Sequence, residues 1–266
     1  MKIPFYQIDA FTNRAFSGCP AAVCPLDAWL PDDLLQKIAN ENNLSETAFF
    51  VPDSGDHDYH IRWFTPTVEM DLCGHATLAS AALIFRDLRP ELDTIRFSSL
   101  SGTLVVNRAG GGRFELDFPL RAGEPGEVPD ELASALGARP DEVRVAGWSM
   151  AVFKDAGTIR TVTPDMGLLA DRFPAGVMVT APGDVDGIDY VVRVFAPGIG
   201  IPEDPATGSA QCTLVPYWAD RLGKTELRAL QVSARGGEFR LRLDGATNRA
   251  LIGGGAVFVI EGTLTI

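Results

Sequence analysis

The chain has little of what metal sites, disulfide frameworks and membrane anchors require. Its 266 residues include four cysteines and three histidines, with neither CxxC nor HExxH spacing, so we expect reduced thiols and no metal ion. No apolar run reaches the roughly 18 residues of a membrane-spanning helix, and the N-terminus has no signal-peptide pattern. The sequence therefore predicts a cytoplasmic protein that does not bind membranes.

Basic residues are also in the minority. The chain has 23 lysines and arginines against 35 aspartates and glutamates, a formal net charge of −12. This balance argues against nucleic acid as a partner, because nucleic-acid binding needs a basic face. Neither a GxGxxG fingerprint nor a GxxxxGK[ST] loop occurs, so we expect no bound nucleotide. Hydrophobic residues at 46% and charged residues at 22% are typical of a globular protein with a core of its own.

What the chain does have is an internal repeat. The segment Arg62–Pro66 resembles Arg193–Pro197, about 130 residues further along the chain. Continued without a gap, the alignment places Cys73 on Asp204. Because this period is far longer than that of a solenoid, it indicates two homologous halves of one molecule.

The repeat also suggests where the halves meet. Glycine, proline and charges make the stretch 120–129 the best linker, so we divide the chain into residues 1–119 and 120–266. An alternative for the domain division is that the last strand returns to the first half. With a few residues of slack, Phe97 aligns with Val232. We expect a cleft between the halves.

Each half combines strand patterns with one strongly apolar helix. Residues 59–64 alternate between apolar and polar, as strands do, whereas residues 76–85 are apolar almost all round and predict an enclosed helix. Residues 208–222 predict a second such helix. The expected fold is α+β, with two pseudo-symmetric lobes that each wrap a mostly antiparallel sheet around a central helix.

The starts of the two apolar helices predict where a small acid would bind. The first backbone N–H groups of a helix have no partner within it and carry partial positive charge, which favours a carboxylate or a developing enolate. Gly74 and Gly208 lie at these starts and would let the backbone approach a ligand closely. We therefore expect a small carboxylic-acid substrate.

A single carboxylate precedes the apolar strand that follows the first predicted helix. Glu46 stands directly before a segment containing Phe49 and Phe50, and the corresponding region near Val177 to Thr180 is apolar. Desolvation strengthens a carboxylate as a base, which suits general-base catalysis. One unmatched base predicts removal and return of a proton on the same face of a substrate. The alternative is a strand-end charge that points into water.

Three further side chains are candidates for the same chemistry. His75 would relay or donate a proton, Asp204 would orient it or hold a substrate amine, and Ser209 offers a hydroxyl group. The structural alternatives are backbone hydrogen bonding for His75 and N-capping for Asp204 and Ser209. Cys73 would act as a second base, contact the substrate or pack in the core.

A resemblance to a known family extends along nearly the whole chain. The segments that carry it are Asp9–Thr12, Phe16–Gly18, Pro20–Val23, Leu44–Phe49, Phe64–Pro66, Cys73–Thr77, Phe195–Pro197 and Glu203–Ala210. Together they resemble the phenazine-biosynthesis PhzF-like family. This resemblance implies the diaminopimelate-epimerase-like fold, a homodimer and the absence of cofactors. One residue departs from the family pattern, because Cys19 stands where the family usually has asparagine.

The resemblance also implies roles for particular residues. They are Glu46 as the general base, His75, Asp204 and Ser209 in support, and Gly74 and Gly208 as backbone donors. The sequence thus favours a cofactor-independent isomerase acting on a small unsaturated or amino carboxylic acid. The alternatives are a two-base epimerase or racemase that uses Cys73 and an acid, and a non-catalytic protein that binds small acids on the same scaffold.

Overall fold

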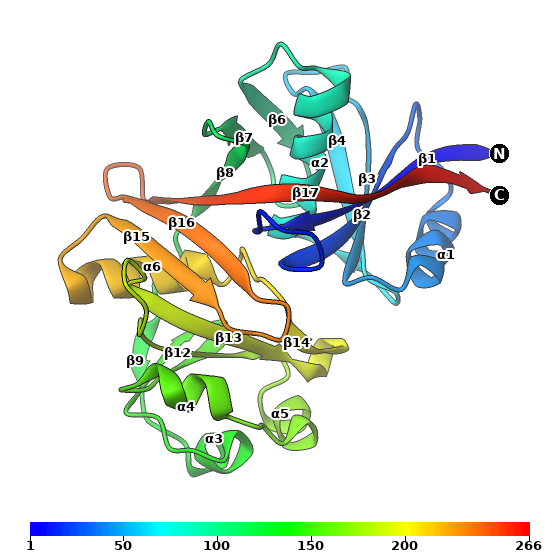
Figure 1. Ribbon diagram of the computed structural model, residues 1–266. Coiled ribbons are helices and arrows are strands. Elements are labelled where there is room, and N and C mark those ends of the chain that lie inside the picture. The colour runs from blue at the N-terminus through cyan, green and yellow to red at the C-terminus, as the bar shows by residue number, and fades with distance from the viewer. The chain divides into compact units, whose positions relative to one another are not determined.

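The computed structural model describes residues 1–266, which fold into two compact units (Figure 1). The first unit comprises residues 1–118 together with 251–266, and the second comprises residues 119–250. Both are mostly β-sheet with a few helices, which confirms the predicted α+β class. Within the structure, every helix is too short or too polar to cross a membrane.

The first unit surrounds one buried helix with strands. Its elements are β1 (Lys2–Ala10), β2 (Cys19–Pro25), α1 (Asp32–Asn42), β3 (Glu46–Pro52), β4 (Tyr59–Phe64), β5 (Glu69–Met70), α2 (Gly74–Leu83), the π-helical turn Ile84–Leu88, β6 (Thr94–Ser98), β7 (Leu104–Arg108), β8 (Arg113–Pro119) and most of β17 (Arg249–Thr265).

Helix α2 is enclosed, as the sequence predicts. All ten of its residues are buried, and α2 lies among the strands of the first unit in Figure 1. Small side chains make this possible, and the two hydroxyl groups of Thr77 and Ser80 donate to the carbonyl groups of Cys73 and Ala76 inside the unit. Buried hydroxyl groups that bond to their own helix cost little, because no polar atom is left unsatisfied.

The second unit has a related set of elements. They are β9 (Glu124–Gly126), α3 (Asp130–Leu136), β10 (Glu142–Ala146), β11 (Trp148–Val152), α4 (Ala156–Thr161), α5 (Met166–Arg172), β12 (Val177–Pro182), β13 (Tyr190–Ala196), the 3₁₀ turn Pro197–Ile199, β14 (Ile201–Asp204), α6 (Gln211–Leu222), β15 (Glu226–Gln231) and β16 (Gly237–Asp244). Strand β9 lies inside the stretch expected to be a linker, and it pairs with β10.

Helix α6 begins later than the apolar pattern predicts. Its first residue is Gln211, and the capping residue Ala210 makes no side-chain hydrogen bond. Ser209 therefore precedes the capping position, and the prediction that Ser209 caps this helix is wrong. Tyr190 explains part of the helix's position, because its hydroxyl donates to Gln211 Oε1 and its ring stacks on Trp218 at 5.5 Å between centroids.

The two units repeat the same strand pairings. In each, one parallel pair (β2–β3 and β11–β12) is followed by an antiparallel pair (β3–β4 and β12–β13), and the last of these strands pairs in parallel with β6 or β15. Tyr59 lies opposite Phe97, and Tyr190 opposite Ala229. The equivalent of Phe97 is therefore Ala229, so the predicted match to Val232 is wrong.

The register also corrects two other predicted equivalences. On one side of these strands, Ala21 pairs with Glu46 of β3, whereas Ser149 pairs with Val177 of β12. On the other side, Phe49 of β3 pairs with Arg62, and Val179 of β12 pairs with Arg193. Aligning the two arginines makes Gly176, the residue before β12, the counterpart of Glu46. Asp204 ends β14 opposite Val194, whereas Cys73 is the N-cap residue of α2, so these two residues occupy different places in their units.

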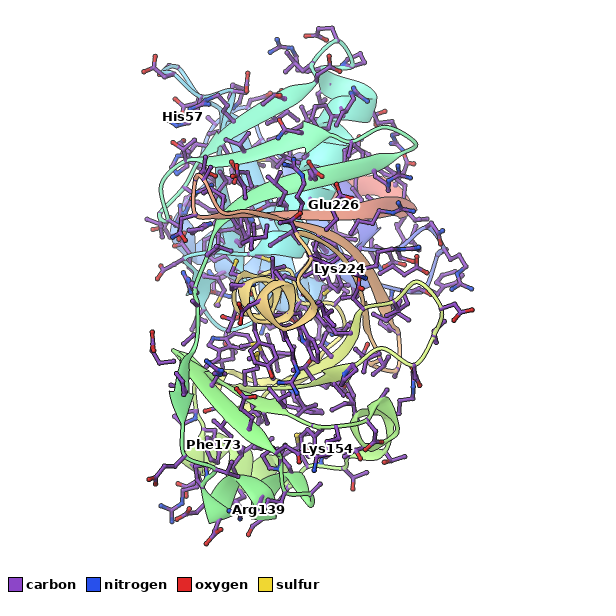
Figure 2. All side chains as sticks on the ribbon, turned by 90° about the vertical axis from the view of Figure 1, so that its left-hand side faces the viewer. His57, Arg139, Lys154, Phe173, Lys224 and Glu226 are labelled. Carbon is purple, nitrogen blue, oxygen red and sulfur yellow. The ribbon has the colours of Figure 1, made fainter.

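Basic side chains at the surface are largely engaged by acids. Arg139 and Lys154, both labelled in Figure 2, form ion pairs with Asp130 at 2.6 Å and with Asp141 at 2.8 Å. Such exposed pairs contribute little to stability. They do, however, leave less free positive charge on a protein that is already acidic.

Candidate functional site

Strand β3 begins with a buried carboxylate. Glu46 is only 6% exposed, and the residues that follow it on β3 are buried as far as Val51. Strand β3 pairs with β2 along one edge and with β4 along the other. The solvent-exposed alternative for this strand-end charge is therefore wrong. An ionised carboxylate held away from water needs a partner, because burial penalises the charged form.

The start of helix α2 supplies that partner. Cys73 caps the helix in an extended conformation, Gly74 is the first helical residue, and His75 follows one position later with 4% exposure. His75 Nε2 lies 3.0 Å from Glu46 Oε2. Although this is ion-pair distance, Glu46 Oε2 accepts no hydrogen bond from the protein. A buried acceptor atom thus remains free.

Thiol groups complete the surroundings of the imidazole. Cys73 Sγ lies 3.6 Å from His75 Nδ1 and 3.9 Å from Nε2. Cys19, the first residue of β2, also hydrogen-bonds to this ring. The position at which the chain departs from the family's usual asparagine therefore contacts the histidine directly.

The charges of this cluster follow from its contacts. Burial alone would lower the pKa of His75, but the sulfur atoms of Cys19 and Cys73 and the carboxylate of Glu46 hold it well above its usual value. Burial, and then the charge of Glu46, raise the pKa of Cys73 against the opposing effect of His75. Both directions favour the protonated forms, an imidazolium at His75 and a thiol at Cys73. A protonated thiol is a poor base.

The same atoms form a set of metal-ligand donors. A carboxylate oxygen of Glu46, Cys73 Sγ and a ring nitrogen of His75 all lie within 4.8 Å of one another. Zinc and related ions accept oxygen, nitrogen and sulfur ligands of these kinds.

The remaining predicted site residues belong to the second unit. Asp204 is half-buried at the end of β14, where Oδ1 accepts from the backbone N–H of Ala206 at 3.2 Å. Gly208 is buried and Ser209 is half-buried in the turn before α6. The structure thus gathers Glu46, Cys73, Gly74 and His75 in the first unit, and it gathers Asp204, Gly208 and Ser209 in one short segment of the second.

Two supporting residues were not predicted. Gln231, on β15, donates through Nε2 to the carbonyl of Asp204 and accepts the backbone N–H of Thr207 at 2.8 Å. It therefore fixes the segment that carries Asp204. In the first unit, the buried carboxylate of Asp9 accepts the N–H of Phe16 at 2.7 Å, which holds the loop leading to Cys19. Only the polarity of Asp9 and Gln231 within apolar strands could have indicated these roles.

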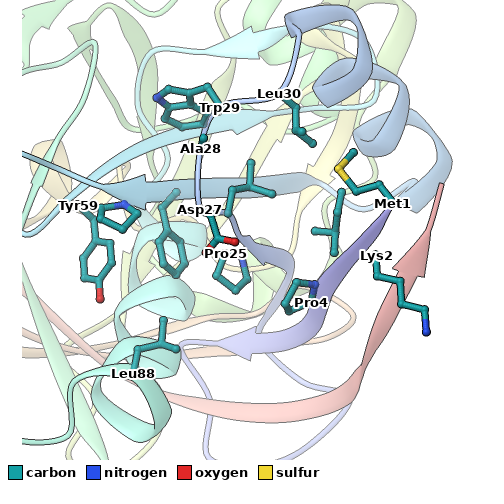
Figure 3. A pocket seen from close by; sticks show the side chains of 14 residues that line it. Met1, Lys2, Pro4, Pro25, Asp27, Ala28, Trp29, Leu30, Tyr59 and Leu88 are labelled. Atoms are coloured by element: carbon teal, nitrogen blue, oxygen red, sulfur yellow. The ribbon is translucent and has the colours of Figure 1, made fainter.

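A large pocket on the first unit lies away from this cluster (Figure 3). It has a volume of about 650 Å³, and Trp29, Tyr59 and Leu88 are among its lining residues, whereas Glu46, Cys73 and His75 are not. Phe50 and Pro52, towards the other end of β3 from Glu46, also line the pocket. At about 3.3 Å per residue, they lie roughly 13 Å and roughly 20 Å along the strand from Glu46. The pocket is therefore not the candidate active site.

Comparison with solved structures defines the class of fold. A PhzF-family protein from Enterococcus faecalis superposes with a TM-score of 0.94 at 42% identity, over 100% of both chains. A hydroxyproline epimerase from Agrobacterium vitis superposes with a TM-score of 0.61 at 12% identity, over 99% of this chain and 92% of that one. The fold is therefore one shared by PhzF proteins and epimerases.

The sequence then identifies the family. Residues 8–262 match the family model described as phenazine biosynthesis-like protein. A protein named uncharacterized isomerase from Pseudomonas aeruginosa is 48% identical over 99% of both chains, and a human phenazine biosynthesis-like domain-containing protein is 41% identical over 100% of both. This chain belongs to the phenazine biosynthesis-like PhzC-PhzF family, and its class is that of the isomerases.

Proposed function

We propose that the protein is a cofactor-independent isomerase that moves a proton on a small unsaturated or amino carboxylic acid, with Glu46 as its single general base. The observation that carries this proposal is the buried Glu46 carboxylate, whose Oε2 accepts no hydrogen bond and lies 3.0 Å from His75. A free acceptor atom in a nearly dry position is what abstraction of a carbon-bound proton requires.

The neighbouring groups divide the remaining work. Glu46 removes the proton and returns it to another carbon of the same molecule. The His75 imidazolium stabilises the negative charge that develops in between, and the N-terminus of α2, beginning at Gly74, adds backbone N–H donors. A positioned general base contributes about 10²- to 10⁴-fold, or roughly 3–5 kcal/mol of barrier.

The second unit contributes to the proposal through three residues. Asp204 would bind a polar group of the substrate, and Gly208 and Ser209 would offer a backbone N–H and a hydroxyl group. We expect Asp204→Asn and Ser209→Ala to raise KM or lower kcat less than a change of Glu46 does. The cytoplasmic location and the homodimer likewise stay predictions.

The alternative with two bases has less support. It needs Cys73 to lose its proton, but burial and the charge of Glu46 both raise the pKa of that thiol. We therefore assign Cys73 to packing against His75 and to substrate contact.

Proton exchange tests this function directly. The protein is incubated in D₂O with a panel of small unsaturated and amino carboxylic acids, and deuterium incorporation is followed by NMR. We expect exchange into at least one acid and its loss by about 10²- to 10⁴-fold in Glu46→Gln. Glu91→Gln is the matched control, because Glu91 is an exposed glutamate paired with Arg89.

Two outcomes would contradict the proposal. Undiminished exchange in Glu46→Gln would remove Glu46 from its role. Binding of acids, detected as a thermal shift, without exchange into any of them would instead favour the non-catalytic acid-binding protein.

A further inference from the structure

Three different donor atoms converge in the first unit at a spacing that suits a metal ion. The His75 Nε2 to Glu46 Oε2 distance is 3.0 Å, and Nε2 to Cys73 Sγ is 3.9 Å. With bonds of about 2.0 Å to nitrogen and oxygen and about 2.3 Å to sulfur, a tetrahedral zinc ion separates its nitrogen and oxygen ligands by about 3.3 Å and its nitrogen and sulfur ligands by about 3.5 Å. Each observed distance differs from these values by about 0.3–0.4 Å.

A second observation points to a ligand at the same place. Glu46 Oε2 is buried and accepts no hydrogen bond, and the side chains of Glu46 and His75 are 8% and 5% exposed. Buried polar atoms are nearly always satisfied in folded proteins, so an exception indicates a group that binds there.

We propose that Glu46, Cys73 and His75 form a binding site for Zn²⁺ or a similar thiophilic divalent ion. The ion takes one carboxylate oxygen, the thiolate of Cys73 and Nε2 of His75, and the protons of the thiol and of the imidazolium pass to solvent. Three protein ligands leave the fourth tetrahedral position to water or to an added anion. Mg²⁺ does not suit the site, because it prefers oxygen ligands in an octahedral arrangement.

The consequence for activity rests on the proposed function. A bound ion uses the Glu46 oxygen that would accept the substrate proton, and it neutralises the charge of the carboxylate. Zinc is therefore a reversible inhibitor of the isomerase, and a chelator restores activity.

Cobalt provides a test that does not depend on activity. Co²⁺ is added to the full-length reduced protein, and the cobalt–thiolate charge-transfer absorption is recorded, followed by displacement with Zn²⁺. We expect the band in the wild type, its loss in Cys73→Ala, and at least a tenfold weaker apparent affinity in Glu46→Gln. Mg²⁺ in excess should leave the band unchanged.

Cys24→Ala is the matched control. Cys24 is a buried cysteine of the same unit outside the donor set. The cobalt–thiolate band of Cys24→Ala should therefore match that of the wild type. Thermal unfolding of each variant establishes that it is folded. Absence of the band in folded wild type with a free thiol, or its persistence in Cys73→Ala, would overturn the site. If proton exchange is absent in metal-free protein, the proposed function fails while the cobalt result still stands.

Discussion

The two units share a scaffold down to individual ion pairs. In the first, Arg62 on β4 binds Glu69 on β5 at 2.7 Å. In the second, Arg193 on β13 binds Glu203 on β14 at 2.7 Å. All four side chains are between 14% and 27% exposed. Equivalent strands with equivalent pairs indicate that both units descend from one structure, and that the shared features serve folding.

The buried carboxylate of Glu46, by contrast, has no counterpart in the second unit. Where the first unit has Glu46, the register of the second places Gly176, whose φ of +115° is disfavoured for residues with side chains. A Cβ atom there would lie 3.1 Å from the carbonyl oxygen of Phe195 and 3.6 Å from the ring of Trp148. A side chain at this position would therefore be strained by its backbone conformation and crowded by its neighbours. Features that differ between the units are thus the ones to examine for function.

The largest expected effect is the difference in proton-exchange rate between the Glu46 and Cys73 variants. We expect Glu46→Gln to lower proton exchange by about 10²- to 10⁴-fold, and Cys73→Ala to lower it by about tenfold or less. In the proposed mechanism the thiol is protonated and supports the imidazole, whereas the carboxylate moves the proton. Exchange rates of both variants, measured on the same acid at equal folded concentration, decide the comparison. Comparable losses would favour the two-base epimerase.

The next effect concerns the position that lacks the carboxylate. We expect Gly176→Ala to lower the free energy of unfolding by about 2–3 kcal/mol, because the backbone conformation and the close carbonyl both oppose a side chain. Glu46→Gln, its counterpart, should change stability by less. Urea unfolding measures both. A neutral Gly176→Ala would mean that the second unit could have accepted a side chain at this position.

The sequence predicted the α+β class and the buried helix α2 for a physical reason. Alternating strands and an apolar helix such as α2 are local patterns, and a long repeat makes each half evidence for the other. The errors lie where loops differ in length between the halves. One residue of difference before β12 makes Gly176 the counterpart of Glu46, where the predicted region lay near Val177 to Thr180. Helix α6 begins at residue 211, where the apolar pattern predicted 208.

The site was only partly predictable from residues alone. Glu46 and His75 were singled out separately by position, but their 3.0 Å contact depends on how β3 packs beside α2. The contact of Cys19 with the same ring was not predicted either. Side chains distant in sequence meet through tertiary packing, which periodicity does not encode.

A smaller effect on stability should distinguish Arg62 from Arg193, the equivalent arginines of the two units. Arg193 also donates through Nη1 to the carbonyls of Ile159 and Val162, at 3.1 and 2.8 Å. The additional partner of Arg62 is Asp32, which is 78% exposed. Because a lost hydrogen bond to a buried group costs about 0.5–1.5 kcal/mol, Arg193→Ala should cost roughly 1–2 kcal/mol more than Arg62→Ala. Equal losses in denaturant unfolding would show that the two pairs are energetically alike.

The smallest effect is a dependence of stability on pH that belongs to the first unit alone. The pKa of His75 is raised in the folded protein by Cys19, Cys73 and Glu46. Its contribution is therefore fully present below the unfolded pKa of about 6.5 and is lost as the pH rises through the folded pKa. We expect the stability of the wild type relative to His75→Gln to fall as the pH rises above about 6.5. Glu46→Gln should flatten this slope, because it removes one of the charges that raise the pKa. A relative stability that increased with pH in the same denaturation series would mean that burial, and not the neighbouring groups, governs His75.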